Sequence, residues 1–235
     1  MPAAGPLRGR RTLALLLAGC AGASQALELR PTTLQLQPGQ TQAELWLVND
    51  QPSPWQGRIL VHQWDQSSGR DRLRPTTAIV ASPALPHLPA GARQRVRLVL
   101  PAALHAPGEQ AFRVLIEPSD PRLPRYSLPL FISPQRTVAS ALSAQLGARG
   151  ATPCLRLHNP GSHRARLQDL AFVAAGGARQ FLQPGLSGYV LPGATVCWGL
   201  PERADGYAGG RFQARRDGTA AEDLGPIAAG ASAGL

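Results

Sequence analysis

Short runs of alternating apolar and polar residues, separated by proline, glycine and asparagine, occupy the chain from Leu27 onward. The clearest run spans 94–100, where Val96, Leu98 and Leu100 occupy every second position. A period of two predicts a half-buried β-strand. Similar runs lie at 34–37, 43–48, 58–64, 79–80, 112–116 and 126–132. Short strands at this spacing, with turn residues between them, are typical of an immunoglobulin-like sandwich.

The second half of the chain repeats the pattern after a change in composition. Residues 134–151 are rich in small side chains, which indicates a linker into a second domain. Further strands are predicted at 154–158, 165–173, 188–191, 195–200 and 211–214. From 217 onward alanine and glycine dominate, so this end has little apolar surface to bury. The predicted fold class is therefore all-β, with sandwich domains at 27–134 and 135–216 and a flexible tail at 217–235.

Residues 1–26 have the pattern of a secretory signal peptide. Three arginines at 8, 10 and 11 precede a short apolar core at 13–18, and Ser24-Gln25-Ala26 supplies small residues before a cleavage site at Leu27. This predicts export to the periplasm. An alternative remains, because residues 17–20 resemble a lipobox in which Cys20 would be acylated and retained.

The cysteines that remain after residue 26 are Cys154 and Cys197. In an oxidising compartment the two cysteines could form a disulfide within the second domain, and they lack the C-x-x-C spacing of a metal or redox site. The alternative is a pair of buried free thiols.

The net charge is +10, and every basic residue is an arginine or a histidine. The arginines at 93, 95 and 97 alternate along a predicted strand and do not form a run with interleaved aromatic residues. This pattern favours solvated strand faces or an acidic protein partner over nucleic acid.

The chain shows no pattern of catalytic or metal-binding residues. Five histidines are scattered without metal-ligand spacing, and the carboxylates are dispersed. The segment 185–188 falls one residue short of a G-x-S-x-G nucleophile elbow, and the glycines at 147 and 150 lack the lysine of a P-loop. We therefore expect a binding protein and not an enzyme, with no catalytic residue, metal, cofactor or small-molecule substrate.

Several segments in order resemble the periplasmic chaperones of bacterial chaperone-usher pathways, and in particular their archaic branch. In the first domain they lie at 29–34, 47–49, 82–83, 88–91, 94–97, 109–117 and 127–131, and in the second at 157–161 and 188–193. The resemblance implies two immunoglobulin-like domains set at an angle, which gives a boomerang shape. It also implies that the protein lends an edge strand to a pilus subunit that lacks one of its own.

In this resemblance the donor strand corresponds to 126–132, and Tyr126, Leu128 and Leu130 are the side chains expected to fill the subunit's groove. The opposing possibility is that this face packs inside the chaperone's own sandwich. In the better-known branch of the family an arginine and a lysine hold the subunit's C-terminal carboxylate, but Thr33 (or its neighbour Leu34) and Pro129 stand at those positions here.

A buried carboxylate favours charge-assisted hydrogen bonds, so Arg113 is the first candidate substitute anchor and Arg30 the second. The expected partners are pilus subunits and an outer-membrane usher. The alternative function is a secreted or lipid-anchored β-sandwich component of the pilus or cell surface.

Overall fold

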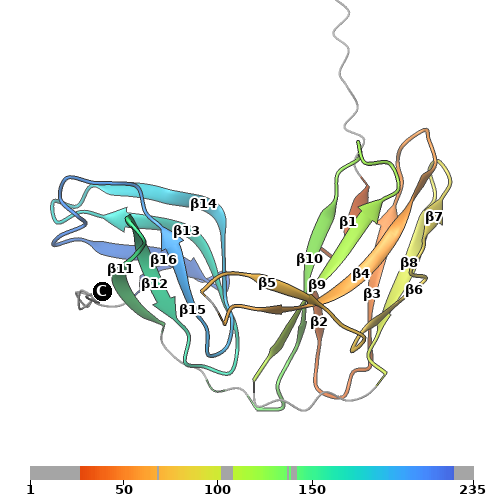
Figure 1. Ribbon diagram of the computed structural model, residues 1–235, viewed down its shortest axis with the longest axis horizontal. Helices are drawn as coiled ribbons and strands as arrows, with labels where there is room; N and C mark the ends of the chain where they lie inside the picture. Colours follow the sequence, from red (N-terminus) through yellow and green to blue (C-terminus); the bar gives the residue numbers. More distant parts are fainter. Residues whose placement is uncertain (1–26, 68, 102–107, 137, 139–141, 225–235) are drawn as a thin grey trace, which may run out of the picture.

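The computed structural model describes residues 27–67, 69–101, 108–136, 138 and 142–224. The predicted signal peptide and Cys20 lie outside these residues. Every regular element in the described part of the chain is a β-strand. Within the same ranges there is no helix of the length and hydrophobicity that a membrane span requires. The all-β class predicted from the alternation is confirmed, and the strands form two sandwiches set at an angle (Figure 1).

The first domain packs a four-stranded sheet against a larger one. The four-stranded sheet has the order β1 (Glu28–Arg30), β3 (Gln42–Val48), β8 (Arg93–Val99) and β6 (Val80–Ser82). The larger sheet has the order β2 (Leu34–Leu36), β10 (Tyr126–Ile132), β9 (Gln110–Pro118), β4 (Trp55–Asp65) and β5 (Arg72–Pro75), with β7 (His87–Leu88) paired to β4.

Alternation places the core of the first domain between these sheets. Val96 and Leu98 of β8 are fully buried, whereas the arginines between and beside them are exposed. Phe112 and Val114 of β9 fill the same core from the larger sheet. Each strand therefore contributes every second side chain to the interior, as a period of two requires.

The second domain has a three-stranded and a four-stranded sheet. The first has the order β11 (Ser143–Arg149), β12 (Thr152–His158) and β15 (Thr195–Gly199), and the second has the order β14 (Arg179–Val190), β13 (Ala165–Val173), β16 (Arg211–Arg216) and β17 (Ala221–Asp223). Phe172, Tyr207 and Phe212 stack on one another in its core, with ring centroids 4.9 to 5.5 Å apart.

Three features of the second domain differ from the sequence-based prediction. Strand β11 lies within the segment interpreted as a linker, because its alternate residues Ala144 and Leu146 face the core. Strand β14 begins nine residues before the predicted strand at 188. The segment predicted to be a loose tail includes β17, and Leu224 beyond it is buried, so only the part after 224 lies outside the described residues.

Cys154 and Cys197 form a disulfide between the neighbouring strands β12 and β15, which is the pairing predicted from the sequence. Their Cα atoms are 5.6 Å apart, within the usual range for a disulfide. Cys154 is fully buried. The bond lies within the three-stranded sheet and closes a loop that contains β13 and β14 of the other sheet.

The two domains meet at an aromatic cluster. Trp64 and Phe131 come from the larger sheet of the first domain, and Tyr189 comes from β14 of the second, with ring centroids 5.5 to 6.0 Å apart. The buried Gln66 adds two hydrogen bonds across the joint, because its amide donates to the Tyr189 carbonyl at 2.9 Å and its carbonyl accepts from the Leu191 N–H at 2.8 Å. These contacts define the angle between the domains.

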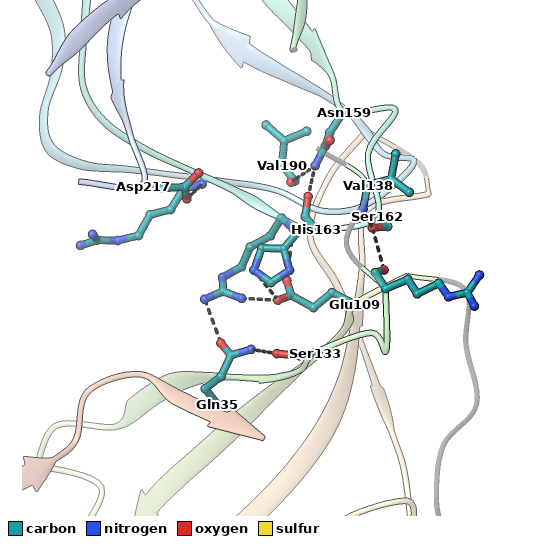
Figure 2. A network of polar contacts seen from close by, with 12 residues as sticks. Gln35, Glu109, Ser133, Val138, Asn159, Ser162, His163, Val190 and Asp217 are labelled. Carbon is teal, nitrogen blue, oxygen red and sulfur yellow. Dashed lines mark hydrogen bonds and ion pairs between the residues drawn. The ribbon is translucent and has the colours of Figure 1, made fainter. Parts of the chain in front are cut away.

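A buried charge cluster lies at the same joint (Figure 2). The Glu109 carboxylate has no exposed surface and forms ion pairs with Arg164 and, at 3.2 Å, with His163 of the second domain. Arg164 also donates to the Gln35 carbonyl at 3.0 Å and stacks on Phe131, with its guanidinium carbon 3.7 Å from the ring centroid. Burial raises the pKa of Glu109, and the charges of Arg164 and His163 oppose that rise.

Candidate functional site

One margin of the first domain leaves strand edges open. Strand β10 is paired along its whole length with β9, but β2 covers only Leu130 to Ile132 on its other side. The half of β10 from Tyr126 to Pro129 has no strand on that side among the described residues. Strand β1 is the outermost strand of the other sheet, and the Leu27 N–H donates to the Tyr126 hydroxyl at 2.8 Å. The open edges of both sheets therefore lie together.

An open edge presents unpaired backbone N–H and C=O groups, which another chain can extend by strand addition. Proline has no N–H to donate to a neighbouring strand, so within sheets it is found mainly on edge strands. Pro129 lies in this half of β10. The edge is therefore suited to receive a further strand over the segment that β2 leaves uncovered.

The face of β10 that was predicted to fill a subunit's groove is occupied in this structure. Leu130 is fully buried and Leu128 nearly so, and both belong to the core of the first domain. Tyr126 is partly buried and packs against the same core. The side chains of Leu128 and Leu130 are thus enclosed by their own sandwich, as the opposing possibility expected, and their groove-filling role stays a prediction.

The change Leu130→Ala distinguishes packing in the core of the first domain from filling the groove of a subunit. We expect it to lower the free energy of unfolding by about 3 kcal/mol, because a fully buried leucine would be replaced by a cavity. Urea denaturation followed by tryptophan fluorescence measures this loss. Unchanged stability together with reduced binding of a subunit would restore the groove-filling role.

Arg113 lies beside the uncovered part of β10, on the outer face of the larger sheet. It is directly opposite Pro129 in the β9–β10 register and opposite His62 in the β4–β9 register. Its guanidinium carbon lies 3.8 Å from the centroid of the Trp64 ring, and the nearest carboxylate oxygen, from Asp71, is 4.0 Å away. Arg113, the first candidate anchor, thus lies next to Pro129, the position at which the better-known branch of the chaperones has a lysine.

Burial lowers the pKa of Arg113, and the charges of Asp71 and Tyr189 oppose this effect. An arginine keeps its charge even so. The guanidinium therefore holds a positive charge that is largely removed from water and only weakly neutralised by its acidic neighbour, which is a favourable environment for a carboxylate.

Arg30 lies elsewhere. It is in β1 of the four-stranded sheet, its side chain is 71% exposed, and it forms an ion pair with Glu28 of the same strand. Leu29 beside it faces the core, so Arg30 points outward from the sheet opposite to that of Arg113. The two candidate anchors are not brought together.

The sequence analysis did not identify the residues around Arg113. Trp64 is almost fully buried at the domain joint, and its Nε1 has no hydrogen-bond partner among the described residues. The same holds for Nδ1 of His62. Both residues lie on the face of β4 that carries Arg113's neighbours, and the alternation of residues 58–64 was the available signal. Tyr189 comes from the other domain, and no local pattern could have placed it there.

Two immunoglobulin-like sandwiches set at an angle, with an open strand margin and a desolvated arginine beside it, correspond to the fold of pilus chaperones. The family model of pili and flagellar-assembly chaperones, PapD N-terminal domain, matches residues 26–137. The first domain of this chain is therefore similar to that family, which is a chaperone family and not an enzyme family.

Solved structures show the same two-domain fold. The chain is similar to a structure of the CsuC–CsuE chaperone-tip adhesion subunit complex from archaic Csu pili of Acinetobacter baumannii, with a TM-score of 0.68, 20% identity, and coverage of 84% of this chain and 96% of that chain. The Escherichia coli chaperone DraB gives a TM-score of 0.56 at 18% identity, with coverage of 84% and 97%. The Pseudomonas aeruginosa chaperone CupB2 gives 0.55 at 17% identity, with coverage of 83% and 97%. No curated protein sequence matches the chain.

Proposed function

We propose that this protein is a periplasmic chaperone that binds pilus subunits by strand addition and passes them to an outer-membrane usher. The observation that carries the proposal is the uncovered half of β10, which lies at the margin where the first sheet also ends and directly beside Arg113. A subunit strand added there would gain backbone hydrogen bonds from β10 and would bring its chain end to the domain joint.

The donor role is assigned to the backbone of β10 between Tyr126 and Pro129, with the Tyr126 side chain at its exposed end. The side chains of Leu128 and Leu130 anchor this strand in the sandwich. Such a rigid, pre-positioned edge lowers the entropic cost of binding, since the chaperone does not have to order its own strand.

Support from related structures is direct for the class of partner. The similar Acinetobacter structure is a chaperone with a tip adhesion subunit, and a Salmonella enterica structure with a TM-score of 0.56 holds the SafB chaperone with the SafA pilin. Export through residues 1–26 would bring this chain into the compartment where such subunits are secreted.

Arg113 is proposed to bind the C-terminal carboxylate of the subunit. We expect Arg113→Ala to weaken binding of a C-terminal subunit peptide roughly tenfold to a hundredfold. This is the loss of affinity that corresponds to the free energy of one charge-assisted hydrogen bond. Fluorescence anisotropy with the mature protein measures the affinity. Arg30→Ala tests the second candidate, and Arg97→Ala on the outer face of the other sheet is the matched control.

The same peptide with a C-terminal amide makes the test specific. With the unmodified protein we expect the amide to bind more weakly than the acid, and with Arg113→Ala the two peptides should bind equally. A preference for the acid that persists in Arg113→Ala and disappears in Arg30→Ala would transfer the anchor to Arg30. Failure of both forms to bind the unmodified protein, together with failure to co-purify any co-expressed subunit, would reject the chaperone function itself.

A further inference from the structure

A second charged recess lies in the second domain, away from the β10 margin. It consists of two hollows of about 410 Å³ each on the outer face of the sheet β11–β12–β15, and Arg156 and Thr195 line both of them. One hollow is closed on its far side by Gln66, Ser67 and Gly69 of the β4–β5 connection in the first domain. We call this recess the arginine groove.

The positive charge of the arginine groove is not neutralised by the described residues that line it. Arg149 and Arg156 line the same hollow, and His158 lines the next one, whereas neither hollow is lined by an aspartate or glutamate. Arg149 donates through one nitrogen to the carbonyls of Cys197 and Gly69, at 2.8 and 3.3 Å. Among the described residues, no further partner occupies its remaining N–H groups or the guanidinium of Arg156, and these donors could bind an anion.

The stem of Arg156 packs against Gly147 of the neighbouring strand β11. A Cβ placed on Gly147 of the neighbouring strand would lie 2.6 Å from Cδ of Arg156, so any larger residue would displace the arginine stem. Glycine within a strand weakens the strand, and the backbone does not require it here, since Gly147 does not have a positive φ. The glycine thus lets Arg156 lie across β11 toward the hollow that it shares with Arg149.

The spacing of the polar side chains indicates the shape of the ligand. Arg156 and His158 are two residues apart on the central strand β12, so their side chains leave the same face roughly 7 Å apart. In an extended polypeptide, side chains at alternate positions have the same separation. One of the two hollows is also bounded by the β4–β5 connection of the other domain, which does not suit a flat membrane surface.

We propose that the arginine groove binds an extended polypeptide segment with acidic side chains at alternate positions. Arg156 would bind one carboxylate at the point where the two hollows meet, with Arg149 on one side and His158 on the other. The lining of this groove includes neither Arg113 nor any residue of β10, so its binding can be tested independently of subunit binding at that margin.

The test uses the mature protein and a labelled peptide of four Glu-Ser repeats, with anisotropy measured at physiological salt. A peptide with the same composition but with its glutamates in one block is the spacing control. We expect the alternating peptide to bind more tightly than the block peptide. Arg156→Ala should weaken its binding tenfold or more, whereas Arg179→Ala, an exposed arginine in the other sheet, should leave it unchanged.

A second variant leaves the net charge unchanged but displaces the side chain of Arg156. Gly147→Ala should weaken the alternating peptide by displacing the Arg156 stem, although the net charge is the same. Equal binding of both peptides, or equal losses in Arg156→Ala and Arg179→Ala, would show diffuse attraction and overturn the proposal. Displacement of the peptide by submillimolar inorganic phosphate would assign the groove to a small anion. Arg156-dependent binding to phosphatidylglycerol vesicles without peptide binding would assign it to a membrane, and either result would also overturn the proposal.

Discussion

Replacement of Arg164 by alanine is expected to lower the free energy of unfolding by about 3 to 5 kcal/mol, because it leaves the buried Glu109 carboxylate without its main partner. The loss includes the stacking of Arg164 on Phe131 and its hydrogen bond to Gln35. Urea denaturation followed by tryptophan fluorescence measures the change, since Trp64 lies at the same joint between the domains.

A matched control and a double variant separate the charge effect from general damage. Arg166→Ala, two residues further along and without a partner in this cluster, should cost less than about 1 kcal/mol. The pair Glu109→Leu and Arg164→Met should be more stable than Arg164→Ala alone, because no unpaired charge remains buried. A double variant as unstable as the single one would contradict this account.

The pH dependence follows from the pKa of Glu109. Burial raises this pKa and Arg164 opposes the rise, so Arg164→Ala should raise it further. Between the ordinary pKa and the raised one the folded variant holds a proton that the unfolded chain has released, and its stability therefore falls as pH increases through that window. We expect the free energy of unfolding of Arg164→Ala to lie closer to that of the unmodified protein at pH 5 than at pH 8. Equal deficits at both values would mean that Glu109 is not the group that responds.

Removal of the disulfide is the second large effect. The double variant Cys154→Ala and Cys197→Ala should lose about 4 kcal/mol, because the bond spans 43 residues of sequence and restricts the unfolded chain. Both changes are made together so that no free thiol remains. Denaturation with and without a reducing agent measures the effect.

The reductant supplies the internal control. It should lower the stability of the unmodified protein to that of the double variant and leave the variant unaffected. An unmodified protein that is equally stable with the reductant, under conditions where loss of the bond is verified by thiol titration, would show that the fold does not depend on this bond.

Most strands were predictable because alternation is a local property. The run at 94–100 predicted β8 almost to the residue, since Val96 and Leu98 face the core and arginines face outward. Strand β11 escaped prediction because Ala144 is small and Gly147 interrupts the pattern. The same glycine accommodates the stem of Arg156. The presence of glycine at position 147 is therefore explained by a residue on the neighbouring strand β12 and not by the pattern of β11 itself.

The candidate site was only partly predictable. Alternation grouped Tyr126, Leu128 and Leu130 on one face, but it could not say whether a partner or the chain's own second sheet covers that face. The proximity of Arg113 to Pro129 was an inference from resemblance, and the β9–β10 register supplies the direct pairing. Tyr189 and Arg164, which complete the joint, lie in the other domain.

The sequence by itself determined the all-β class, the existence of two domains and the pair of cysteines, because each depends on composition or on spacing along the chain. Only the tertiary structure decided which face of β10 is buried, which strand edge is open, and which charges meet at the joint and in the arginine groove. Those features depend on contacts between residues far apart in sequence, such as Glu109 with Arg164 and Gln66 with Leu191. Periodicity carries no information about such contacts.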